Sequence, residues 1–146
     1  MIGEFFMGHV QPNLVAAWSS RGTRHAVAQT ELLPPLLSRI AWRHKLAGRR
    51  LLCFTDNETI REAVITGMSR ALSTRDLLLG LSVADSHNGT VSWIARVPSA
   101  SNPADAPSRG QPEALTWCQL AQVAARELEL DASGNVCPLA LSLQFL

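Results

Sequence analysis

Three acidic residues of this chain, Glu31, Asp56 and Asp105, stand where carboxylates could share one site. Asp56 directly follows a short apolar stretch with the pattern of a buried strand, and Asp105 follows the next strand-like stretch. Ligands of open α/β sheets bind at the carboxyl ends of strands, so both acids are expected at one edge. Glu31 belongs to a predicted helix that leans on the same sheet. Together the three carboxylates would bind a hard divalent cation, Mg²⁺ or Mn²⁺.

Each acid also has an ordinary structural interpretation. The helix dipole favours a carboxylate in the first turn of a helix, which applies to Glu31 and Asp105. Asp56 suits the cap of the helix that follows it. Segment 101–109, SNPADAPSR, contains the Asn, Pro, Asp and Ser residues typical of a turn followed by a helix start. Spacing alone leaves the metal site and these capping roles both open.

The elements that must position the acids follow from hydrophobic periodicity. The pattern indicates strands over 2–10, 49–56 and 90–98, and helices over 12–20, 30–48, 57–67, 73–89 and from 112 through 123. This order predicts an α/β fold in which helices pack on a mixed sheet.

Three details of this prediction concern burial and helix ends. Strand 49–56 is continuously apolar, which is typical of a strand covered on both faces. Pro34 and Pro35 are expected in the first turn of their helix, where a missing N–H has no partner to lose. Trp93 and Trp117 are expected to pack in the core.

Composition excludes several classes of protein. The 146 residues have a formal net charge of +1, so the overall electrostatic field of the chain does not favour an anionic partner. Three widely spaced cysteines without a CxxC pair predict neither a disulfide framework nor a zinc cluster, and favour an intracellular protein, cytoplasmic or nuclear. No apolar run approaches the roughly 20 residues of a membrane span, and no association with a membrane is expected.

Three local strings give a more specific indication when they are read together: AQTELLPPLLSRIAW around Glu31, LLCFTDNETIREAV around Asp56, and ARVPSASNPADAPSR around Asp105. They resemble successive motifs of the ribonuclease H-like domain attached to reverse transcriptases of retrotransposons. The N-x-A-D-x-x-S-R pattern of the third string is the most specific. Glu31 and Asp56 are 25 residues apart and Asp105 follows 49 residues later, which suits that family.

The resemblance implies hydrolysis of the RNA strand of an RNA–DNA hybrid by two Mg²⁺ ions, or Mn²⁺, held by four carboxylates. By that resemblance Asp105 matches the ligand of the nucleophile-side metal, and Glu31 and Asp56 match ligands of the second metal. Asn57 would support the ligands. Arg109 would either contact a phosphate or form a salt bridge at a helix end. The implied partners are an RNA–DNA hybrid or other nucleic acid and an attached reverse transcriptase.

Basic residues follow Glu31 in the predicted helix, among them Arg39 and Arg43. Such residues either track a nucleic-acid backbone, in which case binding weakens steeply with salt, or complement the helix dipole and stay solvated. Both interpretations remain open from the sequence.

The chain departs from the family at its start. The family carries a bridging Asp in its first strand, whereas only Glu4 precedes Glu31 here. We therefore expect residues 1–128 to form a ribonuclease H-like domain that lacks its first strand or strands, with weak or absent nuclease activity. The alternatives are a non-catalytic remnant that binds nucleic acid or protein, and a fragment without a selected function. Residues 129–146 form a tail that either adds a strand to the sheet edge or stays outside the fold.

Overall fold

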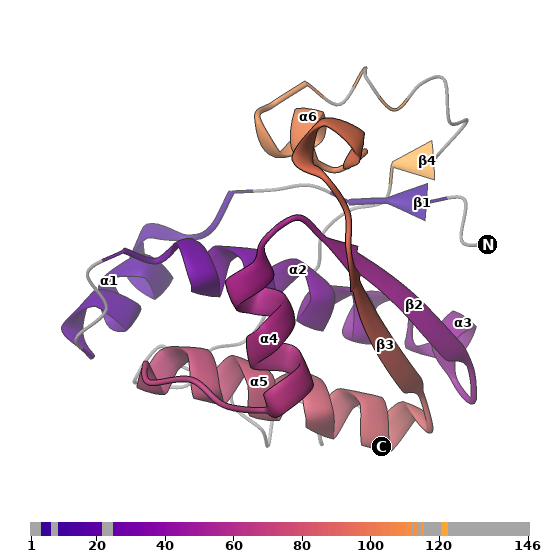
Figure 1. The fold of residues 1–146 in the computed structure, drawn as a ribbon, viewed down its shortest axis with the longest axis horizontal. Coiled ribbons are helices and arrows are strands. Elements are labelled where there is room, and N and C mark those ends of the chain that lie inside the picture. Colours follow the sequence, from indigo (N-terminus) through magenta and orange to yellow (C-terminus); the bar gives the residue numbers. More distant parts are fainter. Residues whose placement is uncertain are drawn as a thin grey trace.

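Helices and parallel strands follow one another along the chain, as the predicted α/β class requires (Figure 1). The computed structural model describes residues 4–6, 9–21, 25–111, 113, 115 and 121–122. The helices are α1 (Pro12–Ser20), α2 (Val27–Ala41), α3 (Arg43–Leu46), α4 (Glu58–Thr66), α5 (Leu72–Asn88) and α6 (Asp105–Ser108), with a 3-10 turn at Ser99–Ser101. The strands are β1 (Glu4–Phe5), β2 (Arg50–Thr55), β3 (Val91–Arg96) and β4 (Ala121–Gln122).

Two pairs of strands form in the described part of the chain, and both are parallel. β2 pairs with β3 over six residues, from Arg50 opposite Val91 to Thr55 opposite Arg96. β1 pairs with β4 over two residues. Between β2 and β3 the chain crosses over through α4 and α5, which is the connection that parallel strands need. The antiparallel pairing of the expected mixed sheet does not occur among these described strands.

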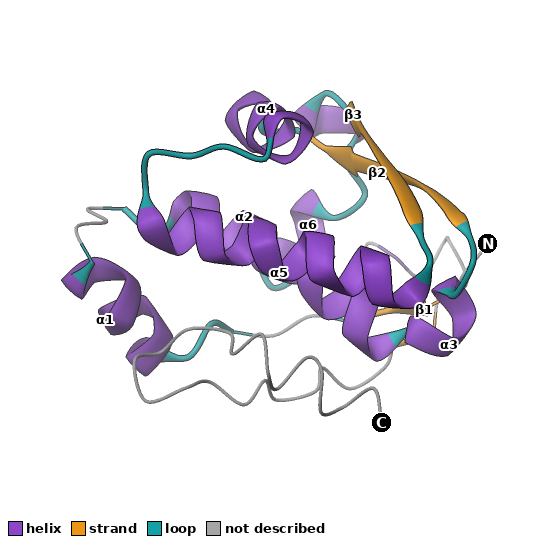
Figure 2. Cartoon of the chain, turned by 90° about the horizontal axis from the view of Figure 1, so that it is seen from below, coloured by secondary structure: helices purple, strands orange, loops and turns teal. Residues whose placement is uncertain are grey.

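The core lies between α2, α5 and α4. Figure 2 shows α2 and α5 side by side, with α4 and the β2–β3 pair on one side of them. Leu32 and Leu36 of α2 are almost fully buried, as are Ile60 of α4 and Leu77 of α5. Apolar residues three and four positions apart place these side chains on one face of each helix, and their burial holds the helices together. No helix in the described residues is long and apolar enough to cross a membrane.

Helix α2 differs from its prediction at its start. It begins at Val27, three residues earlier than expected, so Pro34 and Pro35 lie inside it rather than in its first turn. A proline has no N–H, so the carbonyls of Thr30 and Glu31 lose their usual partners four residues on. The helix continues because its apolar face is buried against α5 and α4, which outweighs the local cost.

One face of the β2–β3 pair is exposed, which corrects the expectation of a strand covered on both sides. Leu52 and Phe54 of β2 are 61% and 59% exposed, and Val91 and Trp93 of β3 are 66% and 67% exposed. The helices cover the other face. Trp93 is therefore a surface residue and not part of the core.

The region after α6 also differs from its prediction. Ala121 and Gln122 pair with β1 as a strand, so a single helix from 112 through 123 is wrong at these two residues, where main-chain pairing with β1 replaces helical bonding. Trp117 and the tail 129–146 lie outside the described residues, and the domain boundary at 128 stays a prediction.

Candidate metal centre

Asp56 and Asn57 are positioned by the end of β2. Strand β2 ends at Thr55, and its carbonyl accepts a hydrogen bond of 2.9 Å from the N–H of Val97, just beyond β3. Asn57 then caps α4, because its side-chain oxygen accepts a 3.2 Å hydrogen bond from the N–H of Ile60. The cap of this helix is thus Asn57 and not Asp56, the capping role that the sequence left open, and Asp56 stands one residue before it at the carboxyl edge of the sheet.

Glu31 reaches the same edge from α2. Its carboxylate accepts a hydrogen bond from the Asn57 side chain and lies close enough to Asp56 for their charges to interact. The Oε2 atom of Glu31 is buried and has no hydrogen-bond partner among the residues that the structure describes. The packing of α2 against α4 brings these residues together although 25 positions separate Glu31 from Asp56.

The pKa of Glu31 is raised from its ordinary value of 4.5. Burial is the main cause, because it penalises the charged form, and the negative charge of Asp56 acts in the same direction. The hydrogen bond from Asn57 opposes both effects by stabilising the carboxylate. A bound cation would relieve both destabilising effects. The two carboxylates supply oxygen atoms, which are the ligands that a hard divalent cation prefers.

Asp105 occupies the turn and helix start that segment 101–109 predicts. The side-chain oxygen of Asn102 accepts a 3.1 Å hydrogen bond from the N–H of Ala104, and Asp105 opens the short helix α6. Figure 1 shows α6 beyond the ends of β2 and β3, on the side where both strands finish. The carboxylate of Asp105 forms an ion pair with Arg109, at 3.0 Å.

Two of the three predicted acids come together, and the third does not join them. Within residues 4–6, 9–21, 25–111, 113, 115 and 121–122, no three His, Cys, Asp or Glu side chains are grouped closely enough to hold one metal ion. Asp105 is instead held by Arg109 one helical turn away. The helix-end salt bridge that the sequence left open for Arg109 is therefore present.

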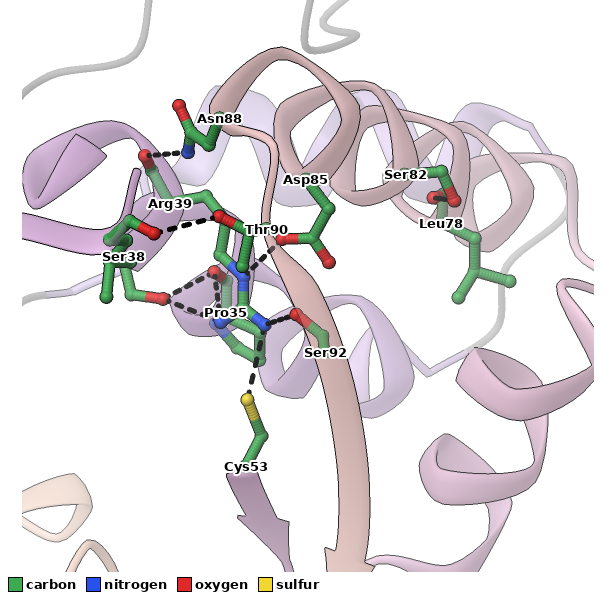
Figure 3. A network of polar contacts seen from close by, with 11 residues as sticks. Pro35, Ser38, Arg39, Cys53, Leu78, Ser82, Asp85, Asn88, Thr90 and Ser92 are labelled. Atoms are coloured by element: carbon green, nitrogen blue, oxygen red, sulfur yellow. Dashed lines mark hydrogen bonds and ion pairs between the residues drawn. The ribbon is translucent and has the colours of Figure 1, made fainter. Parts of the chain in front are cut away.

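Arg39 is the clearest correction among the predicted site residues. Its side chain is buried, with 4% of the residue exposed, so it neither faces nucleic acid nor stays solvated, the two roles that the sequence left open. Its Nε donates to Asp85 at 3.0 Å and its Nη2 to Ser92 at 2.8 Å, as Figure 3 shows. The other donated hydrogen bonds go to the Cys53 sulfur, the Ser38 hydroxyl and the Pro35 carbonyl. All five N–H groups of the guanidinium are used inside the protein.

The sequence analysis missed this network. Its members come from α2, α5, β2 and β3, and Asp85 lies 46 residues from Arg39. No local motif connects them, so the sequence offered only the general rule that a buried charge needs partners. Arg43, at the start of α3, is exposed, and its predicted contact with nucleic acid stays a prediction.

The comparisons with known proteins add nothing to this geometry. Protein-family models, curated proteins and solved structures were all searched with this chain, and none of them matches it.

Proposed function

We propose that this chain is the ribonuclease H-like domain of a retrotransposon-type reverse transcriptase, and that Glu31 and Asp56 hold a Mg²⁺ or Mn²⁺ ion. Such a domain hydrolyses the RNA strand of RNA–DNA hybrids. The observation that carries the proposal is the meeting of Glu31 with Asp56 at the carboxyl edge of a parallel strand pair, with one Glu31 oxygen buried and without a hydrogen-bond partner in the described part of the chain. A carboxylate oxygen left in this state is a natural cation ligand.

The residues of the proposed site would have separate roles. Glu31 and Asp56 bind the cation, and Asn57 keeps the Glu31 carboxylate in place through its hydrogen bond. A bound divalent ion supplies charge stabilisation and an activated water for phosphodiester hydrolysis. Asp105 stands beyond the same strand ends and would join the site by exchanging its contact with Arg109 for the cation. Arg109, no longer paired with Asp105, would then contact a phosphate.

The test is a calorimetric titration of the full chain with MgCl₂ and with MnCl₂. We expect saturable binding that Glu31→Gln and Asp56→Asn each abolish, because each removes one of two ligands. The exposed acid Glu62 on α4 provides the control, and Glu62→Gln should bind like the unsubstituted chain. Equal heats from all variants, or no saturation in any, would refute the metal site.

One observation favours a second function. The ion pair between Asp105 and Arg109 leaves the Glu31–Asp56 pair without a third acid among the described residues. A non-catalytic remnant that binds nucleic acid or protein would retain this arrangement. A labelled RNA–DNA hybrid separates the two functions: Mg²⁺-dependent cleavage that Asp105→Asn abolishes supports the nuclease, whereas binding without cleavage supports the remnant.

A further inference from the structure

Arg96 lies at the carboxyl edge of the β2–β3 pair, beside the proposed metal site. It is the last residue of β3 and pairs in register with Thr55, which Asp56 directly follows. Side chains two positions apart leave a strand on the same face, so Arg96 shares the face of the buried Ile94. Helix α4 packs on this face, and its first residue, Glu58, forms an ion pair with Arg96. The Arg96 side chain therefore lies on the helix-covered side of the sheet, at the edge where the two acids meet.

The guanidinium of Arg96 is only weakly held in place. Its Nε lies 3.8 Å from Oε2 of Glu58, which is too far for a hydrogen bond, and 66% of its side chain is exposed. Arg61 holds the same carboxylate closely, since its Nε and Nη2 donate to Oε1 of Glu58 at 2.9 and 2.6 Å. The hydrogen bond from Arg61 is the main cause that lowers the pKa of Glu58. In the part of the chain that the structure describes, the Arg96 side chain donates no hydrogen bond, so its donors remain open to a ligand.

An arginine beside a divalent cation matches the chemistry of a phosphate group. The planar guanidinium donates two parallel hydrogen bonds to phosphate oxygens. A cation held by Glu31 and Asp56 would attract the same group, and arginine with Mg²⁺ is a common clamp on phosphoryl groups. The two carboxylates by themselves would repel it. A phosphate at this edge would therefore contact both the cation and Arg96.

We propose that Arg96 binds a backbone phosphate of the nucleic-acid strand and holds that strand against the cation. This inference rests on the proposed function, because the cation belongs to the Glu31–Asp56 site. It also places the strand at one end of the molecule. Arg49 is exposed as well, but it precedes the start of β2, about 20 Å from the carboxyl edge, and would not contact the same phosphate.

The experiment measures binding of the full chain to a labelled RNA–DNA hybrid by fluorescence anisotropy in MgCl₂, with the ribose hydroxyls methylated to prevent cleavage. Arg96→Gln should weaken binding about tenfold, because it removes a charged hydrogen-bond contact. It should also lower the slope of log affinity against log salt by about one phosphate contact. Arg49→Gln removes the same charge at the opposite end of β2 and should change neither quantity. Equal losses from the two variants, no loss from Arg96→Gln, or no binding by the unsubstituted chain would overturn the proposal.

Two further measurements separate the phosphate contact from a general charge effect and from the metal site. Arg96→Lys keeps the charge without the planar fork, so it should keep the salt slope and recover only part of the affinity. Full recovery would contradict the paired hydrogen bonds.

In calorimetric titration with MgCl₂, Arg96→Gln should bind Mg²⁺ at least as tightly as the unsubstituted chain, whereas Glu31→Gln should not bind it. Failure of the Mg²⁺ titration beside a retained Arg96 effect would refute the metal site alone. Intact Mg²⁺ binding with unchanged hybrid affinity in Arg96→Gln would refute the phosphate contact alone. Circular dichroism of each variant confirms that the fold is retained.

Discussion

Helix α2 carries a buried cation in its last turn and a partly buried carboxylate near its start. The cation, Arg39, uses all five of its N–H groups within the protein, on partners from three other elements and its own helix. The carboxylate, Glu31, accepts a hydrogen bond from Asn57 and lies near the like charge of Asp56, and no described residue bonds to its second, buried oxygen. One helix thus holds a satisfied charge and an unsatisfied one.

The difference between Arg39 and Glu31 distinguishes a buried charge that stabilises the fold from one that could bind a ligand. A buried charge whose hydrogen bonds are complete fixes how elements meet, and here Arg39 joins α2 to α5 and to both strands. A buried charge beside a like charge costs stability and is retained where a ligand completes it. We therefore interpret the Arg39 network as structural, and the Glu31–Asp56 pair remains the proposed metal site.

The largest expected effect is the loss of stability when the Arg39 network at the C-terminal end of α2 is broken. Arg39→Met leaves the partly buried Asp85 without its cation and removes every hydrogen bond of the network, which should lower the free energy of unfolding by up to about 3 kcal/mol. Urea denaturation followed by circular dichroism measures this loss. Arg75→Met removes an exposed arginine of α5 and should change stability by less than about 0.5 kcal/mol. A loss at position 39 no larger than that of the control would show that the network contributes little.

A smaller effect is expected from Asn57, which serves both the fold and the site. Asn57→Ala removes the cap of α4 and should cost about 1 kcal/mol of stability. It also removes the hydrogen bond that lowers the pKa of Glu31, so that pKa should rise further. Carbon-13 NMR titration of the Glu31 carboxyl group measures the shift. Asn57→Asp keeps a cap but adds a charge, and an unchanged Glu31 pKa in both variants would exclude the contact.

Removing the charge of Glu31 should increase stability slightly when no metal is present. The pKa of Glu31 is raised in the folded state. Protonation of this carboxyl group therefore stabilises the fold fully below the unfolded-state pKa of 4.5. This stabilisation is lost as the pH rises through the folded-state pKa. Glu31→Gln should therefore be more stable than the unsubstituted chain at neutral pH, and the difference should close by about pH 4.

Urea denaturation at both pH values tests this, with Glu62→Gln as the control. Saturating Mg²⁺ should reverse the order at neutral pH, because only the unsubstituted chain gains binding energy. A Glu31→Gln variant that is less stable at every pH would mean that the carboxylate stabilises the fold by itself.

The smallest effect on stability is expected at the third acid. Arg109→Ala breaks an exposed ion pair one turn apart in α6, which should cost less than about 0.5 kcal/mol. If Asp105 completes the metal site, its release from Arg109 should increase the affinity for Mg²⁺ measured by calorimetry. Adding Asp105→Asn to Arg109→Ala should then cancel this increase in affinity. Unchanged affinity would place Asp105 outside the site.

Local signals in the sequence predicted the elements well where one segment decides its own structure. Helix α1 matches its prediction at Pro12–Ser20, β2 and β3 lie within their predicted strands, and the Asn102–Asp105 turn precedes α6 as expected. Turn residues and hydrophobic periodicity act over a few positions, so the sequence carries them directly.

Predictions failed where distant segments compete with local preference. Pro34 and Pro35 indicate a helix start, yet burial against α5 and α4 extends α2 past them in both directions. Leu52 and Trp93 have apolar side chains that suggest burial, but each points to the face that the helices do not cover. Burial of a strand residue depends on what packs against its side of the sheet, and a short sequence window does not contain that information.

The sequence by itself determined which residues could form the site, because Asp56 and Asp105 each follow a strand and Glu31 lies in a helix 25 residues before Asp56. Only the tertiary structure decided which of them meet. The packing of α2 against α4 joins Glu31 to Asp56, while a partner one turn away holds Asp105. It also decided that Arg39 is internal. Side-chain types set the possible chemistry, but burial and distance between remote segments determine whether a charge finds a partner, water or a ligand.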